Sequence, residues 1–285
     1  MDEPALWGLR RKLLDLGARL GLARPAVRLY EALLAAKSAG SAGRAHEDGG
    51  LPLPPARLRA AAGPKHADAE YFLQSGRHHA ELVRELLGDS GTSVEELGAL
   101  LDWGCGCGRI LRHWNGLTGT RVVGCDVNPK MVDWCNANLP FAEVTKTEMS
   151  PPLPYADSTF DLVYAFSVFT HLPEALQHDW MRESRRVLKP GGFLLMSTLG
   201  EYYLSLKRLT DDERQTFLNG KVVVLYEGAP GTSLCSAYHP PGYVHDQLGA
   251  ELELAAFRPA AADGRHDMHL FRKPAVSVVA GGQQS

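Results

Sequence analysis

The chain has 285 residues, of which 45% are hydrophobic and 22% charged, and its formal net charge at pH 7 is −3. These values are ordinary for a globular protein. The sequence contains no block of lysine and arginine that would favour a nucleic-acid partner. No apolar run approaches membrane-spanning length, and the first residues do not have the form of a signal peptide. The five cysteines lack disulfide-like spacing, so we expect a cytoplasmic protein.

The N-terminal part is predicted to be an addition to a larger domain. Leucines recur at helical spacing in residues 1–37, which predicts a helical segment that packs on the core or forms a homodimer with a second subunit. A helix on a membrane surface is the weaker alternative, because Asp15 interrupts the basic face. Residues 38–64 are rich in Ala, Gly and Pro and predict a linker. The main domain is expected at residues 65–274, with a loose tail at 275–285.

Residues 70–87 predict one helix, or two helices separated at Gly76. The apolar stripe of this helix consists of Leu82, Val83, Leu86 and Leu87. Ser93 with Glu96 predicts a capping box before the next strand.

The most informative stretch is Leu100-Leu101-Asp102-Trp103-Gly104-Cys105-Gly106-Cys107-Gly108-Arg109. It predicts a buried strand, a tight glycine turn and a helix that starts at Ile110. Glycine lets the chain turn sharply and lets a ligand lie against bare backbone. The N-terminus of the helix would offer free N–H groups beside that ligand.

The spacing of the glycines excludes two classes of ligand site. A phosphate loop would end in Gly-Lys-Ser/Thr, whereas this chain continues as Gly108-Arg109-Ile110. A dinucleotide fingerprint would place the third glycine three residues after the second, whereas Gly106 is followed by Gly108. The remaining pattern is acidic-x-Gly-x-Gly-x-Gly, starting at Asp102. A glycine turn that only packs a helix on a strand is the simpler alternative.

The segments that follow continue an alternation of strands and helices. Residues 121–126 predict a second strand that ends in Asp126, whose carboxylate can accept hydrogen bonds from both hydroxyls of a ribose. Asn128 and Pro129 predict the start of a helix. Further strands are predicted over residues 142–145, 160–166 and 193–195. With the glycine pattern, these elements in this order resemble the class I S-adenosylmethionine (SAM) methyltransferases over residues 66–274.

The resemblance implies an α/β, Rossmann-like fold: a seven-stranded, mostly parallel sheet with helices on both faces and an antiparallel last strand. It also implies SAM as the cofactor, with the ribose on Asp126 and the adenine beside Glu148, where the family more often has Asp. Part of the linker would lie over this site. Arg77 would pair with the methionine carboxylate, although a solvated arginine fits the sequence equally well. The implied contacts are Arg77, Asp102, Gly104, Cys105, Gly106, Gly108, Asp126, Val127, Glu148, Met149, Phe166 and Ser167.

Residues 201–247 exceed what the family core needs between its fifth and sixth strands, so we interpret them as an insert that forms the acceptor-binding wall. Within the insert, Thr210 with Glu213 predicts a capping box. Residues 222–226 and 233–237 predict a hairpin.

Two histidines are the candidate catalytic residues. His171 follows the fourth strand and His239 lies in the insert. If the nucleophile is a hydroxyl, a base must remove its proton, and histidine can do so near neutral pH. The alternatives are a buried histidine beside a helix start for His171 and a loop histidine held by its prolines for His239.

No metal site is expected. Cys105, Cys107 and Cys125 lack the further ligands of a tetrahedral site and suit small apolar packing. Side chains in the run His266-Asp267-Met268-His269 alternate in direction along a strand and do not converge. We therefore predict metal-independent methyl transfer to a hydroxyl, amine or carbon of a small molecule such as a secondary metabolite or sugar. The alternatives are other SAM chemistry (cyclisation or aminocarboxypropyl transfer) and a non-catalytic SAM-binding partner protein.

Overall fold

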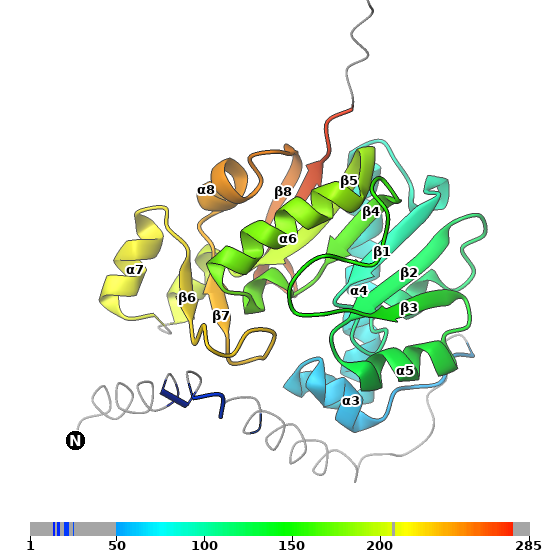
Figure 1. The fold of residues 1–285 in the computed structure, drawn as a ribbon, viewed down its shortest axis with the longest axis horizontal. Helices are drawn as coiled ribbons and strands as arrows, with labels where there is room; N and C mark the ends of the chain where they lie inside the picture. Colours follow the sequence, from blue (N-terminus) through cyan, green and yellow to red (C-terminus); the bar gives the residue numbers. More distant parts are fainter. Residues whose placement is uncertain are drawn as a thin grey trace, which may run out of the picture.

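The computed structural model describes residues 50–206 and 209–275, with residues 14, 16, 17, 20–22 and 25 before them (Figure 1). The predicted N-terminal helical segment and its homodimer contact lie almost wholly outside the described residues. The first part of the predicted linker and the tail after residue 275 lie outside them as well.

A seven-stranded sheet in the order β3-β2-β1-β4-β5-β9-β8 forms the centre of the domain. Strand β9 runs antiparallel to β5 and β8, and the other neighbours are parallel. The strands are β1 (Ala99–Trp103), β2 (Arg121–Asp126), β3 (Ala142–Lys146), β4 (Phe160–Ala165), β5 (Leu188–Thr198), β8 (Glu253–Ala262) and β9 (His266–Arg272). This topology confirms the predicted fold class.

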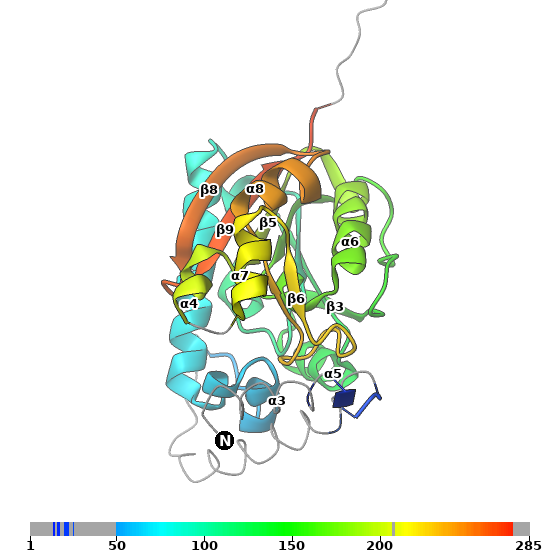
Figure 2. The same ribbon diagram turned by 90° about the vertical axis from the view of Figure 1, so that its left-hand side faces the viewer.

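Helices cover both faces of the sheet because side chains alternate along each buried strand. Leu100 and Leu162 pack with the apolar face of α4 (Ala69–Asp89) on one side. Leu101 and Val163 pack with α6 (Glu174–Val187) on the other. Figure 2 shows the sheet edge-on between α4 and α6.

The sequence rules for helix starts hold at three further places. Asn128 accepts a hydrogen bond from the N–H of Lys130 at 3.1 Å and begins a helix with proline in its first turn. The capping boxes predicted from Ser93 and Thr210 are both formed. The remaining helices are α3 (Ala56–Ala61), η2 (Pro64–Ala67), η3 (Val94–Glu96), η4 (Leu111–Trp114), α5 (Pro129–Asn138), η5 (Phe169–His171), η6 (Glu201–Leu206), α7 (Asp211–Leu218), α8 (Pro241–Tyr243) and the π-helical turn η7 (Val244–Leu248).

One local prediction was wrong. The glycine turn leads into the single 3₁₀ turn η4 instead of a helix, because the chain reverses at Gly116 and Gly119, both at positive φ, before β2 begins. The end of the predicted linker forms α3, whose Arg59 is buried and donates to the carbonyl oxygens of His66 (3.1 Å) and Ala67 (2.6 Å). These bonds hold α3 beside the glycine turn, where the methyl group of Ala62 lies 3.7 Å from an ideal Cβ position at Gly106.

The insert forms a separate two-stranded antiparallel sheet, as predicted, from β6 (Val223–Leu225) and β7 (Ser236–Tyr238). It joins the main sheet where β5 ends, because Leu199 pairs with Tyr238 and accepts a hydrogen bond from the N–H of His239 at 2.8 Å. The insert therefore stands at the carboxyl edge of the parallel strands, which is the edge where open α/β sheets bind ligands.

Candidate functional site

The glycine turn is tied to the end of β2 by backbone hydrogen bonds. The N–H groups of Gly104 and Cys105 both donate to the carbonyl oxygen of Cys125, at 2.8 and 3.1 Å. The carboxylate of Asp126 accepts from the N–H of Gly106 at 2.9 Å and from the N–H of Asn128 at 2.8 Å. Burial raises the pKa of Asp126, and these N–H groups oppose that shift. Each carboxylate oxygen keeps further acceptor capacity for a ligand hydroxyl.

All three glycines of the turn have positive φ, which disfavours a side chain. A Cβ at Gly104 would also lie 2.5 Å from Cγ2 of Val168, and one at Gly108 would lie 2.5 Å from Cδ1 of Leu139. At Gly106, which is buried, a Cβ would lie 3.7 Å from Ala62 and from the sulfur of Met131, an ordinary van der Waals contact, whereas the backbone of Gly104 is exposed.

Asp102 is buried near the end of β1, and only Trp103 separates it from the turn. Burial raises its pKa to about 7, and the hydroxyl of Tyr164 opposes the shift by hydrogen bonding to the carboxylate. That hydroxyl accepts in turn from the indole N–H of Trp114 at 2.7 Å. The first acid of the motif is therefore held inside the domain by aromatic residues of η4 and β4.

A cluster of polar side chains that the sequence analysis missed joins the turn to α4. The Arg109 guanidinium lies 2.9 Å from Nδ1 of His79 and 3.4 Å from the hydroxyl of Ser75. The other ring nitrogen of His79 lies 3.3 Å from the carboxylate of Asp263, in the turn between β8 and β9. The His79 ring stacks on Phe166 at a centroid distance of 4.7 Å. The position of Arg109 directly after the last glycine was the only sequence signal for this cluster.

Protonation in this cluster follows from its donors. An arginine can only donate, so Nδ1 of His79 accepts and the proton of the neutral ring is on the nitrogen facing Asp263. Burial and the neighbouring Arg109 lower the pKa of His79 to about 4. His66 and His266 also interact electrostatically with Arg109, and burial lowers the pKa of each to about 4.

The predicted Arg77 lies on the same helix as Ser75 and His79. It lies on the exposed face of α4, whereas Ser75, Gly76 and His79 lie on the buried face that meets Arg109. A Cβ at Gly76 would lie 2.2 Å from the carbonyl oxygen of Arg109, so glycine permits this close approach.

Other predicted contacts lie near the ends of β2, β3 and β4. Val127 is exposed, and Glu148 is exposed and paired with the ammonium group of Lys146 at 2.5 Å. The backbone oxygen of Met149 accepts from the indole of Trp180 at 3.1 Å. Ser167 has φ 57° and donates its N–H to the hydroxyl of Ser197 at 2.7 Å. A strained non-glycine residue at the end of a parallel strand is a common feature of functional sites.

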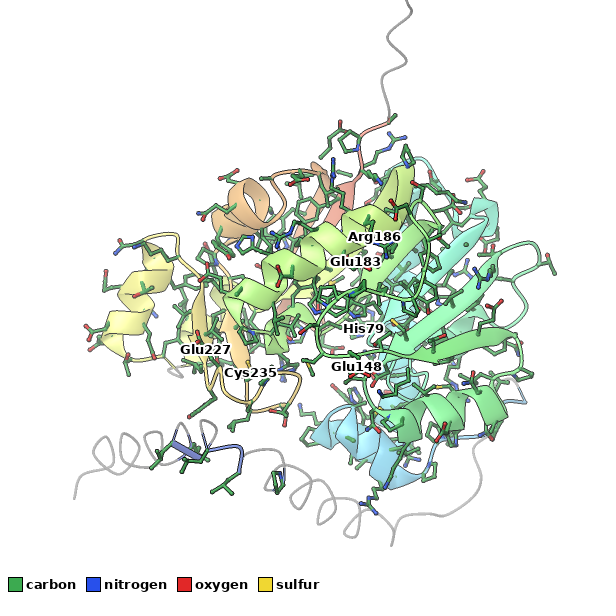
Figure 3. All side chains as sticks on the ribbon, in the orientation of Figure 1. His79, Glu148, Glu183, Arg186, Glu227 and Cys235 are labelled. Carbon is green, nitrogen blue, oxygen red and sulfur yellow. The ribbon has the colours of Figure 1, made fainter. Side chains whose placement is uncertain are left out.

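The structure brings His171 to the edge of the insert. Its Nδ1 lies 2.6 Å from the carbonyl oxygen of Cys235, so Nδ1 carries the proton and Nε2 keeps a lone pair. Its backbone oxygen accepts from the N–H of Gly231 at 2.8 Å. Burial lowers the pKa of His171, and the ring interacts electrostatically with His266. In Figure 3, the labelled Cys235 lies on the insert and His79 on the main domain.

His239 directly follows β7, and its side chain is completely buried. Its Nε2 donates to the side-chain oxygen of Gln177 at 2.9 Å. Burial lowers its pKa to about 3. The two candidate catalytic histidines therefore differ in their surroundings, because the ring of His239 is bonded to α6 and that of His171 to the insert.

Within the described ranges, no group of three or more His, Cys, Asp or Glu residues is arranged to hold a metal ion. The helices described there also include none that is both long and apolar enough to cross a bilayer.

The residues around the turn fit the cofactor that the sequence resemblance implies. The backbone of Gly104 is exposed, the Asp126 carboxylate can accept from ribose hydroxyls, and Arg109 supplies a cation. The turn lies between β1 and β2, beside the point where the strand order reverses from β1 to β4. Doubly wound sheets bind nucleotides at that point.

Comparisons with known proteins agree with this geometry. Residues 101–196 match the family described as "Methyltransferase domain". The chain is 32% identical to a sterol 24-C-methyltransferase of Schizosaccharomyces pombe over 128 residues. The aligned region covers 43% of this chain and 32% of the relative. It is 30% identical to a malonyl-[acyl-carrier protein] O-methyltransferase of Hahella chejuensis over 138 residues, and this aligned region covers 47% of each chain. The chain thus spans half or less of the length of these two relatives.

A solved structure from Pyrococcus horikoshii shares the fold with a TM-score of 0.53 and 20% identity, over 72% of this chain and 92% of that one. The family match covers the glycine turn, the acid that ends β2 and the strands on either side of the switch point. On this evidence residues 101–196 are similar to the methyltransferase domain family, and the chain has the fold of the solved structure.

Proposed function

We propose that this protein transfers a methyl group from SAM to a small-molecule acceptor. The observation that carries the proposal is the hydrogen-bonded unit of Asp126 and Gly106, which joins a ribose-binding carboxylate to a bare-backbone turn. The match to methyltransferases that act on a sterol and on a malonyl group supports a small acceptor. SAM supplies the methyl group; the protein must orient the acceptor, exclude water and accept any proton that is released.

The acceptor side is proposed to lie between η5 and the insert. His171 is the candidate base, because its Nδ1 proton is committed to Cys235 and its Nε2 lone pair is available. Burial lowers the pKa of His171, so the neutral, proton-accepting form prevails at neutral pH. His239 is not part of this proposal, since its ring is sealed in the core.

The cofactor half of the proposal is tested by binding of S-adenosylhomocysteine, measured by calorimetry. We expect Asp126→Ala to weaken binding by about 10–100-fold, because charge-assisted hydrogen bonds to the ribose are lost. Asp133→Ala is the matched control, since this exposed carboxylate lies on the adjacent α5. Equal affinity of wild type and Asp126→Ala would overturn the ribose assignment.

The chemical half is tested with methyl-labelled SAM and a panel of hydroxyl, amine and carbon nucleophiles. Label in the product, with release of S-adenosylhomocysteine, supports methyl transfer. Product that contains the aminocarboxypropyl group, or a cyclised product without label, would replace the proposal with the corresponding SAM-dependent reaction. Binding of SAM without any product over the whole panel would favour a binding partner instead. We further propose a cytoplasmic, metal-independent enzyme.

A further inference from the structure

The imidazole of His266 lies at the ligand edge of the sheet. Strand β9 runs antiparallel to β5, so its first residue, His266, lies at the edge where β4 and β5 end. The next residue anchors this position. The Asp267 carboxylate accepts from the N–H of Ala260 at 2.8 Å and packs against Gly200, where a Cβ would collide with it. Because side chains alternate along a strand, His266 points to the face opposite to Asp267.

The neighbours of the His266 ring come from both halves of the candidate site. It interacts electrostatically with Arg109, beside the glycine turn, and with His171, at the insert. The ring of Tyr203 in η6 lies next to it, at a centroid distance of 5.8 Å and an interplanar angle of 31°. His266 therefore lies near enough to the candidate base to contact the same acceptor.

The ring nitrogens of His266 are uncommitted, in contrast to those of the neighbouring histidines. Nδ1 of His171 is bonded to the insert, and Nδ1 of His79 is bonded to Arg109. Among residues 50–206 and 209–275, none hydrogen bonds to the His266 ring, which is half-buried. A neutral imidazole has one donor and one acceptor, so this ring can bind a hydroxyl or a carbonyl oxygen.

The charge and shape of these surroundings favour an uncharged aromatic ligand. Burial lowers the pKa of His266 to about 4 and also lowers the pKa of His171, so both rings are neutral near neutral pH. Phe166 directly follows β4 and Tyr203 lies shortly after β5, and both rings are largely buried. Aromatic side chains bind planar rings by offset or edge contacts.

We propose that the acceptor is an uncharged aromatic molecule with two oxygen functions, and that His266 hydrogen bonds the second while His171 accepts the proton of the first. This inference rests on the proposed function, because it requires methyl transfer beside His171. In that transfer the bond from sulfur to the methyl carbon breaks, a carbon–oxygen bond forms, and the hydroxyl proton passes to Nε2 of His171. His266 gains and loses no proton, so it determines specificity and orientation.

The test compares acceptor probes that differ only in the second oxygen. Dissociation constants of 2-naphthol and of naphthalenediols with the second hydroxyl at position 3, 6 or 7 are measured by calorimetry in the presence of S-adenosylhomocysteine. We expect wild type to bind at least one diol about 5–30-fold more tightly than 2-naphthol, which is the effect of one hydrogen bond. His266→Phe should bind that diol and 2-naphthol equally, because it keeps a ring beside Tyr203 without the nitrogens. His78→Phe, at an exposed position of α4, is the control and should keep the wild-type ratio.

Each other result has a distinct meaning. If His266→Phe weakens all the probes equally and keeps the ratio, His266 supports the fold alone and the inference is wrong. If His266→Phe does not fold, the same ratio in His266→Ala decides, and a wild-type value overturns the assignment. A wild type that binds no diol more tightly than 2-naphthol also overturns it.

The failure of the proposed function is recognised separately, with methyl-labelled SAM. If wild type binds none of the naphthols but transfers label to another nucleophile of the panel, the aromatic acceptor is wrong and the proposed function stands. If wild type transfers label to no nucleophile, the proposed function itself fails.

Discussion

Nδ1 of His171 lies 2.6 Å from the backbone oxygen of Cys235, and this bond connects η5 to the insert. It also fixes the tautomer, so that the lone pair of Nε2 faces away from the insert strand. The N–H of Gly231 donates to the backbone oxygen of His171 at 2.8 Å, which gives the contact a second anchor. One side chain thus both holds the insert in place and offers a base.

Replacement of His171 by alanine is therefore expected to lower kcat by about 10²–10⁴-fold with a hydroxyl acceptor, while the affinity for SAM changes little. Burial lowers the pKa of His171, so wild-type activity should be constant near neutral pH and fall only on the acidic side of the ordinary histidine range. That acidic limb should disappear in the variant. His239→Gln is the control and should keep the wild-type kcat. An unchanged kcat in a folded His171→Ala enzyme would remove His171 from the reaction.

The contact between α4 and the glycine turn gives a second prediction. Gly76→Ala would place a Cβ 2.2 Å from the carbonyl oxygen of Arg109, so α4 must shift away. We expect the free energy of unfolding to fall by about 1–3 kcal/mol, and the affinity for SAM to fall with it. The control is Gly88→Ala in the same helix, where nothing lies within 4 Å of the new methyl group. That change should be neutral or stabilise by about 0.5–1 kcal/mol. Urea unfolding and calorimetry measure both effects, and equal behaviour of the two variants would contradict the packing argument.

Much of the fold could be predicted because its signals are local. The glycine turn, the acid that ends β2 and the capping residues Asn128, Ser93 and Thr210 each depend on a few adjacent residues. Their order along the chain then determined the sheet topology. The helix expected after Ile110 failed for a local reason as well, since glycines follow it within one short segment.

The parts of the site that the sequence did not indicate depend on contacts between residues far apart in sequence. Helical spacing identifies the apolar face of α4, but it does not show whether Arg77 or His79 meets the ligand edge. That choice is made by packing of Gly76 on Arg109. Asp263 reaches His79 only because the β8–β9 turn and α4 meet over the sheet. His239 was assigned by its position in the insert, whereas its burial involves a hydrogen bond to Gln177 of α6, a residue distant in sequence.

Removal of metal ions provides a third prediction. No group of three or more potential ligands converges in the part of the chain that the structure describes. Alignment and a neutral base are sufficient for the proposed reaction. Turnover should therefore survive dialysis against EDTA. Loss of turnover that magnesium or zinc restores would mean that metal ligands were missed, and metal analysis of the dialysed protein is the necessary control.

The buried histidines give a fourth prediction, on stability. Burial lowers the pKa to about 4 in His79 and to about 3 in His239, below the ordinary value near 6.5. Between pH 6.5 and these values the unfolded chain binds protons that the folded chain excludes. The free energy of unfolding should therefore be highest above pH 6.5 and decline as the pH falls, with a slope of at most about 1.4 kcal/mol per pH unit for each such histidine.

Urea unfolding of wild type and His239→Gln between pH 7.5 and 4.5 isolates one of these contributions. Glutamine can still donate to the side-chain oxygen of Gln177 but does not titrate, so the variant loses the acid penalty of a buried imidazole. We expect the variant to be less stable than wild type at pH 7.5, because packing is disturbed, and the difference to narrow steadily below pH 6.5. His78→Gln is the control, since this side chain is exposed on α4 and solvent surrounds it before and after unfolding. Parallel curves for wild type and His239→Gln over the whole range would show that His239 is not held neutral by burial.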